Sequence, residues 1–154
     1  VVTQVMRGRA VRPKILSEKD VQIMFKAIHE LQKVKSMLVE IEEGLAPTAP
    51  KTKPQLITDK MHVVRRTVDS IIESLGKLEE KPAELQRIVK EINQAVGTFS
   101  EALRVILRNY ADFQRGELAL SSYKKIFEPF RKDLRYAHDK LSNIEETLRE
   151  LAKK

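Results

Sequence analysis

The chain has 154 residues, of which 42% are hydrophobic and 33% charged, and its formal net charge is +7. It contains no cysteine, which excludes a disulfide scaffold and a thiolate metal site, and its 5% aromatic content favours a helical bundle over a sandwich or barrel. This length suits one domain with a modest core, and no apolar run approaches the roughly 18 residues that indicate a membrane span. The lack of cysteine is also typical of a reducing compartment, so we expect a cytoplasmic protein.

The positive charge is concentrated near the N-terminus and in one internal segment. Six basic residues lie in two stretches without acidic residues, namely Arg7, Arg9, Arg12 and Lys14 in residues 1–16, and Lys51 and Lys53 in residues 46–56. The rest of the chain is close to neutral. We expect residues 1–16 to form an irregular basic arm, and such arms steer acidic partners or lipid surfaces without specifying them.

The first predicted helix spans residues 17–44. Ser17 is a favourable N-cap with Asp20 three positions on, as in a capping box, and Gly44 suits a left-handed C-cap. Between them, apolar residues recur every three or four positions, which predicts one buried helix face. These residues are Val21, Met24, Phe25, Ile28, Leu31, Val34, Leu38 and Ile41.

Residues 45–57 are predicted to be the one long linker, because three of the six prolines lie there. Within this linker, Pro47, Thr48, Ala49 and Pro50 form a PTAP tetrapeptide. It resembles the late-domain motif that the ubiquitin-variant domain of the ESCRT-I machinery binds, and its prolines favour an extended, accessible segment. A simple stiff linker is the alternative interpretation.

Two further helices are predicted over residues 58–79 and 82–114. Thr58 is the expected N-cap of the former, and Pro82 is well placed at the first position of the latter, where its missing N–H is no loss. Both segments keep an apolar residue at every third or fourth position.

The last predicted helix spans residues 118–152 and follows a turn near Gly116. It contains Pro129, which we expect to kink or divide the helix. Four amphipathic segments in series predict an all-α fold, an antiparallel four-helix bundle that forms a single domain over residues 17–154.

No arrangement of residues indicates catalysis, a cofactor or a metal. His29, His62 and His138 lie on three different helices without a helical neighbour of the right spacing, and the five glycines are scattered rather than clustered in a phosphate loop. The paired glutamates are best explained as solvated helix ends, namely Glu42–Glu43, Glu79–Glu80 and Glu145–Glu146. We therefore expect a protein that is not an enzyme.

Basic residues form two helical stripes that could meet across the turn at Gly116. The first stripe is Arg104, Arg108 and Arg115, and the second is Lys124, Arg131 and Arg135. If both stripes share a face, they form a strip that could bind an acidic amphipathic helix or a phosphorylated tail. The alternative is a solvated face balanced by Glu101, Glu128 and Asp133. Nucleic-acid binding is disfavoured, since the strip lacks interleaved aromatic residues.

Three stretches carry a resemblance to a known family. They are Ile15 to Val21 with Phe25, Ile28, Glu30 and Leu31; then Val96, Gly97, Phe99, Tyr110 and Phe113; then Pro129, Arg131, Lys132, Leu134, Arg135 and Tyr136. In this order they resemble the three conserved regions of Dbl-homology domains, the exchange factors for Rho-family GTPases. That resemblance implies nucleotide exchange through distortion of the GTPase switch loops.

A second resemblance covers residues 58–141. Its best-matched positions are Ile88, Val89, Lys90, Glu91, Ile92, Ala95, Val96, Tyr110, Lys124 and Lys125. The pattern is similar to that of focal-adhesion-targeting-like bundles, including the homologous domain of programmed-cell-death-10 proteins. This resemblance implies a basic, apolar groove that holds acidic leucine-rich helices.

The favoured interpretation is a non-enzymatic adaptor or scaffold module that binds an acidic segment of a protein partner. The first alternative is a guanine nucleotide exchange factor for a Rho-family GTPase. The second is a self-assembling structural bundle, which leaves homo-oligomerisation open.

Overall fold

The computed structural model describes residues 16–48 and 52–153, and this part of the chain folds as an all-α bundle. Its helices are α2 (Glu18–Leu45), α3 (Pro54–Leu75), α4 (Leu85–Gln114) and α5 (Leu120–Lys153), without a strand among the described residues. The predicted four-helix bundle is thus confirmed.

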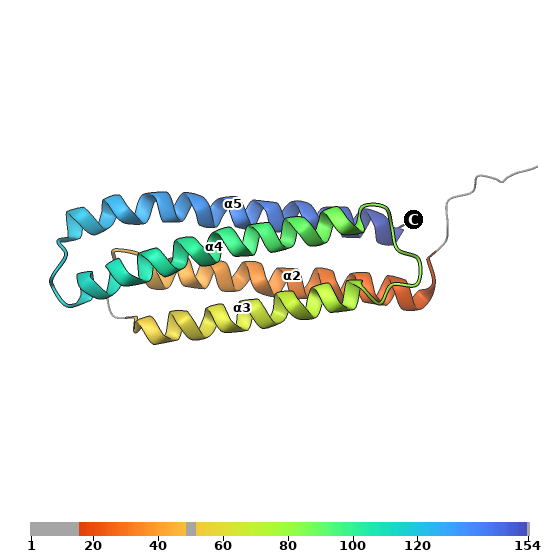
Figure 1. The fold of residues 1–154 in the computed structure, drawn as a ribbon, viewed down its shortest axis with the longest axis horizontal. Coiled ribbons are helices and arrows are strands. Elements are labelled where there is room, and N and C mark those ends of the chain that lie inside the picture. The colour runs from red at the N-terminus through yellow and green to blue at the C-terminus, as the bar shows by residue number, and fades with distance from the viewer. Residues whose placement is uncertain (1–15, 49–51, 154) are drawn as a thin grey trace, which may run out of the picture.

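The helices alternate in direction along the bundle. Figure 1 shows the end of α2, the start of α3 and the α4–α5 turn at one end, and the α3–α4 connection with the C-terminus at the other. Each helix packs on its neighbours in sequence, and α2 also packs on α5, which closes the ring. Contact is weakest between α3 and α4, so that side of the bundle is the least tightly closed.

The predicted apolar seams form one continuous core. Residues such as Leu31, Val64, Ile92 and Leu141 have no measurable exposure. Two residues expected in the first seam lie outside the core, since Phe25 is 48% exposed and Val21 is only partly buried. Burial in α2 instead follows the alternation of four- and three-residue steps through Met24, Ala27 and Leu31, which leaves Phe25 on the flank.

The start of α2 is tied to the α3–α4 connection. Ser17 caps the helix as predicted, since its Oγ accepts the Asp20 N–H at 3.1 Å. The buried Asp20 carboxylate, however, accepts the backbone N–H groups of Glu79 and Glu80, both at 3.0 Å. These two bonds, that of Glu79 first, lower the pKa of Asp20. The carboxylate therefore fixes a distant loop rather than acting as the glutamate of a capping box would.

The boundaries of α3 differ from the prediction at both ends. The helix begins at Pro54 rather than Thr58, so the linker is shorter than residues 45–57. Proline lacks the N–H that a first helical position leaves unpaired, and Thr58 instead donates its hydroxyl to Pro54 O at 3.3 Å from inside the helix. The helix ends at Leu75, since Gly76 is its C-cap.

The third predicted helix starts later than expected, at Leu85 rather than Pro82. The Leu85 N–H donates to Pro82 O at 3.1 Å, so Pro82 belongs to a turn before α4. The preceding loop is held to α2 by Asp20, and it buries Leu78 in the core. This long-range anchor places the loop where the sequence indicated the first turn of a helix.

Gly44 and Pro129 both lie inside helices. Gly44 is not a left-handed C-cap, because α2 continues to Leu45. The C-cap is Ala46, whose φ is −60°. A Cβ at Gly44 would lie 2.9 Å from Ile57 Cδ1, so glycine permits the close approach of α3 there. The predicted division of the last helix at Pro129 is wrong, since α5 runs through this residue from Leu120 to Lys153.

At the end of the bundle where the α2–α3 linker lies, aromatic residues of α4 and α5 form hydrogen bonds with the backbone on either side of that linker. Tyr110 donates its hydroxyl to Thr52 O at 3.0 Å, and Tyr123 donates its hydroxyl to Leu45 O. The Tyr123 ring also stacks on Phe113, with 4.7 Å between the ring centres, and burial raises the pKa of its hydroxyl. Gly116 shapes the turn that brings these rings together, with φ +77°.

Two predicted features fall largely outside the described residues. The basic arm over residues 1–16 is described at Leu16 alone, which is partly buried against the core. Of the PTAP tetrapeptide, Pro47 is partly buried and Thr48 exposed in a turn, whereas Ala49 and Pro50 are outside the described part. None of the helices described here is long and apolar enough to cross a bilayer.

Candidate functional site

The three predicted arginines of α4 share the outward face of that helix. Arg104, Arg108 and Arg115 are all exposed. Lys90, also exposed, lies 18 residues before Arg108, which is about five full turns, so it falls on the same line. We call Lys90, Arg104, Arg108 and Arg115 the basic stripe.

The structure places two of the three predicted α5 residues elsewhere. Arg131 Nε and Arg135 Nη2 lie 3.3 and 3.8 Å from Glu42 Oε2 of α2, on the flank of α5 that faces α2. The flank of α5 that faces α4 is marked instead by Lys140, whose Nζ is 3.7 Å from Glu91 Oε2.

The turn at Gly116 therefore does not bring the two predicted stripes onto one face. Lys124, seven residues before Arg131, is exposed on the same side of α5 as that arginine. A helix pair buries the sides that face each other. Both the basic stripe of α4 and the predicted stripe of α5 lie away from the α4–α5 contact. The predicted strip across both helices required that the two stripes share a face, and Arg131 and Arg135 do not share the face of the α4 arginines. The candidate surface is therefore a stripe along α4.

Members of the basic stripe differ in their counter-ions. Arg104 Nη2 lies 2.8 Å from Glu101 Oε2, and Arg115 pairs with Asp112 and Glu117. Lys90 and Arg108 form no ion pair or hydrogen bond with residues 16–48 or 52–153. The stripe thus has two cations without a counter-ion in the described part of the chain.

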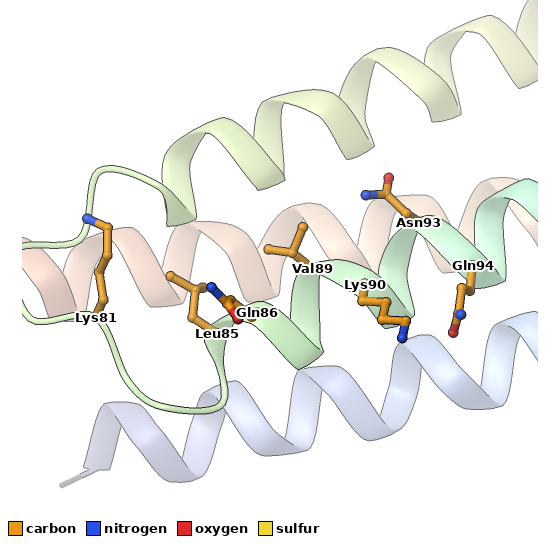
Figure 2. Close-up of a pocket in the computed structure, with 7 residues that line it drawn as sticks. All are labelled: Lys81, Leu85, Gln86, Val89, Lys90, Asn93 and Gln94. Atoms are coloured by element: carbon orange, nitrogen blue, oxygen red, sulfur yellow. The ribbon is translucent and has the colours of Figure 1, made fainter.

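A depression of about 700 Å³ adjoins the Lys90 end of the stripe. Figure 2 shows its lining, which comes from the start of α4 and the loop before it: Lys81, Leu85, Gln86, Val89, Lys90, Asn93 and Gln94. Val89 and Asn93 point toward α3, whereas Lys90 and Gln94 point toward the opposite side of α4. Leu85 and Val89 make part of the lining apolar, and no acidic side chain belongs to it.

Two other depressions mix charges of both signs. One of about 580 Å³ between α2 and α3 is lined by Lys33 and Glu40, among others. Another on α3 combines Arg65 and Arg66 with Asp59 and Asp69. The α4 depression differs from these two, because it presents lysines beside apolar groups and has no carboxylate in its lining.

The histidines lie on three different helices. His29 and His62 are exposed on α2 and α3, and His138 is partly exposed on α5. Among the described residues, no group of three or more histidine, aspartate or glutamate side chains could hold a metal ion.

A buried ionic cluster between α2 and α5 was not foreseen. Glu145 was predicted to belong to a solvated helix end, but it is only 9% exposed. Its Oε1 forms an ion pair with Lys35 Nζ at 2.8 Å, without the geometry of a hydrogen bond. Its Oε2 accepts from Arg149 Nη2 at 2.8 Å and from Gln32 Nε2 at 3.2 Å. Burial alone would raise the pKa of Glu145, but the ion pair with Lys35 and the hydrogen bonds from Arg149 and Gln32 outweigh burial and lower it.

A signal for this cluster exists in the sequence. Glu145 directly follows the core residue Ile144, and Lys35 directly follows the core residue Val34. Residues beside the seam of an antiparallel helix pair face the neighbouring helix, so opposite charges at such positions can pair. We conclude that these charges hold α2 against α5.

No protein-family model matches the chain, and neither a curated protein nor a solved structure is significantly similar to it.

Proposed function

We propose that this protein is a non-enzymatic helical interaction module whose α4 face binds an acidic amphipathic helix of a partner protein. The observation that carries the proposal is the basic stripe beside the apolar depression, with Lys90 and Arg108 lacking counter-ions among the described residues. A carboxylate-bearing partner would supply those counter-ions, and its apolar face would cover Leu85 and Val89.

The shape of the surface favours a helix as the occupant. Lys90 and Arg108 lie about 27 Å apart along α4, at 1.5 Å per residue. A partner helix of similar length could present a carboxylate to each cation from one face, since side chains three and four residues apart align along a helix. The least tightly closed side of the bundle, between α3 and α4, flanks the depression.

Charge disfavours the chain itself as the occupant. Residues 1–15 hold four basic and no acidic residues, so this segment would be repelled by the stripe. If two copies packed antiparallel through α4, with the contact centred midway between Lys90 and Arg104, Lys90 of one copy would lie against Arg104 of the other. Like charges in direct opposition oppose association.

A binding measurement with charge-reversed variants tests the proposal. The probe is a fluorescein-labelled designed helix of about six turns, with leucines along one side, glutamates on both flanks and a central alanine. A second peptide, in which every glutamate is replaced by lysine, is the control for charge. We expect the acidic helix alone to bind, and Lys90→Glu with Arg108→Glu to weaken binding at least about tenfold, or 1.4 kcal/mol.

The matched control reverses two lysines on another face. Lys26→Glu with Lys33→Glu changes the net charge by the same amount on exposed positions of α2. It should leave binding nearly unchanged, because both lysines lie on a different helix from the stripe. Equal weakening by both double variants, or no binding of the acidic helix to the wild-type protein, would reject the proposal.

A further inference from the structure

Gly97 occupies a position at which the described fold gives no reason for glycine. It lies inside α4, which spans Leu85–Gln114, and a glycine within a helix lowers the stability of that helix relative to alanine. A residue with this cost is usually explained by a tight turn, a positive φ or a close contact.

Neither backbone conformation nor internal packing accounts for Gly97. Among the described glycines, Gly116 has a positive φ, whereas Gly97 has the φ of an ordinary helical residue. Apart from its chain neighbours and the adjacent backbone of α4, a Cβ built at Gly97 meets no atom within 4 Å in the described part of the molecule. Gly44 provides the contrast, because its Cβ would lie 2.9 Å from the side chain of Ile57.

Gly97 also lies on the basic stripe, midway between its first two members. It is seven residues from Lys90 and seven from Arg104, and seven residues are close to two helical turns. The absence of a side chain therefore creates a low point on the outward face of α4, with a cation about two turns away on each side.

We propose that Gly97 is the crossing point at which the backbone of the acidic partner helix approaches α4 most closely. This inference rests on the function proposed above and specifies the partner further: it is an acidic helix with glycine, alanine or serine opposite Gly97. The separation of two packed helices is set by the side chains at their contact, so small residues on both sides permit the closest approach. Close approach also shortens the distance from partner carboxylates to Lys90, which has no counter-ion among the described residues.

The test adds a side chain at the low point and measures binding of the same acidic designed helix. Gly97→Ala should weaken binding by about threefold and Gly97→Leu by at least about tenfold, while circular dichroism shows both proteins folded. Thr98→Leu is the matched control, since this exposed position is the next residue but points about 100° away around the helix. It should bind like the wild-type protein.

A change in the probe provides a second readout. Replacing the central alanine of the designed helix by leucine should weaken binding to the wild-type protein. If Gly97→Leu binds as tightly as the wild-type protein, while Lys90→Glu with Arg108→Glu abolishes binding, the crossing point is wrong and the proposed function stands. If the wild-type protein does not bind the acidic helix, the proposed function fails and the crossing point fails with it.

Discussion

The α2–α5 seam and the outward face of α4 use similar charged residues in opposite ways. In the seam, Glu42 lies between Arg131 and Arg135, and Glu145 lies between Lys35 and Arg149, so each carboxylate has its cations within the fold. On α4, Lys90 and Arg108 have no counter-ion in the described residues. The seam charges are thus paired between two helices of the fold, whereas the α4 charges are those that we propose a partner binds.

The largest effect is expected from removing the central carboxylate of the seam. Glu145→Ala leaves Lys35 and Arg149 facing each other without their shared anion, so we expect the free energy of unfolding to fall by about 2 kcal/mol. Urea denaturation followed by circular dichroism measures this loss. The exposed neighbour Glu146 is the control, and Glu146→Ala should change stability by less than about 0.5 kcal/mol. Equal effects of the two substitutions would show that the buried cluster contributes no stability.

Acidification should weaken the fold through two carboxylates. The pKa values of Asp20 and Glu145 in the folded protein lie below their ordinary values of 3.8 and 4.5. Their contribution is therefore complete above about pH 5 and is lost as the pH falls through the ordinary values toward the lower folded values. Melting temperatures between pH 7 and pH 3 should fall less steeply for Asp20→Asn than for the wild-type protein. Parallel profiles for the two proteins would contradict this role of Asp20.

A smaller effect of opposite sign is expected on the α4 face. Gly97→Ala should raise the free energy of unfolding by roughly 0.5–1 kcal/mol, because alanine favours the helix and its Cβ meets no other atom of the described fold. Urea denaturation can measure this gain. A loss of stability would mean that Gly97 has a structural role within the bundle after all.

The smallest effect on stability should come from the two cations without counter-ions. Lys90→Glu with Arg108→Glu removes no internal ion pair of the described residues, so the free energy of unfolding should stay within about 0.5 kcal/mol of the wild-type value. Thermal and urea unfolding both check this expectation. A loss comparable to that of Glu145→Ala would erase the distinction between the two regions.

The sequence predicts the helices well because their burial is periodic. Residues such as Leu31, Ile92 and Leu141 recur at helical spacing and are buried in the structure. Local signals at helix ends are less decisive. Pro54 begins α3 four residues before the expected cap at Thr58, and the loop before α4 is fixed by Asp20, a residue about 60 positions earlier in the chain.

The candidate site could be predicted in part. Helical spacing correctly aligns Arg104, Arg108 and Arg115 on one face of α4. The spacing within one helix does not determine which neighbour each flank faces, so Arg131 and Arg135 could not be assigned to the α2 side from their own stripe. The role of Glu145 depends on residues more than 100 positions away, and such pairings are set by the packing of the whole bundle.

Mapping where an acidic helix contacts the protein distinguishes the α4 face from the α2–α5 seam. Amide chemical shifts of the ¹⁵N-labelled protein, recorded during titration with the designed acidic helix, report the surface that it covers. We expect the shifts to cluster on α4 and the loop before it, from Lys81 to Arg108, and the α2–α5 seam around Glu42 and Glu145 to stay unchanged. Shifts concentrated on the α2–α5 seam, or none at saturating peptide, would contradict this expectation.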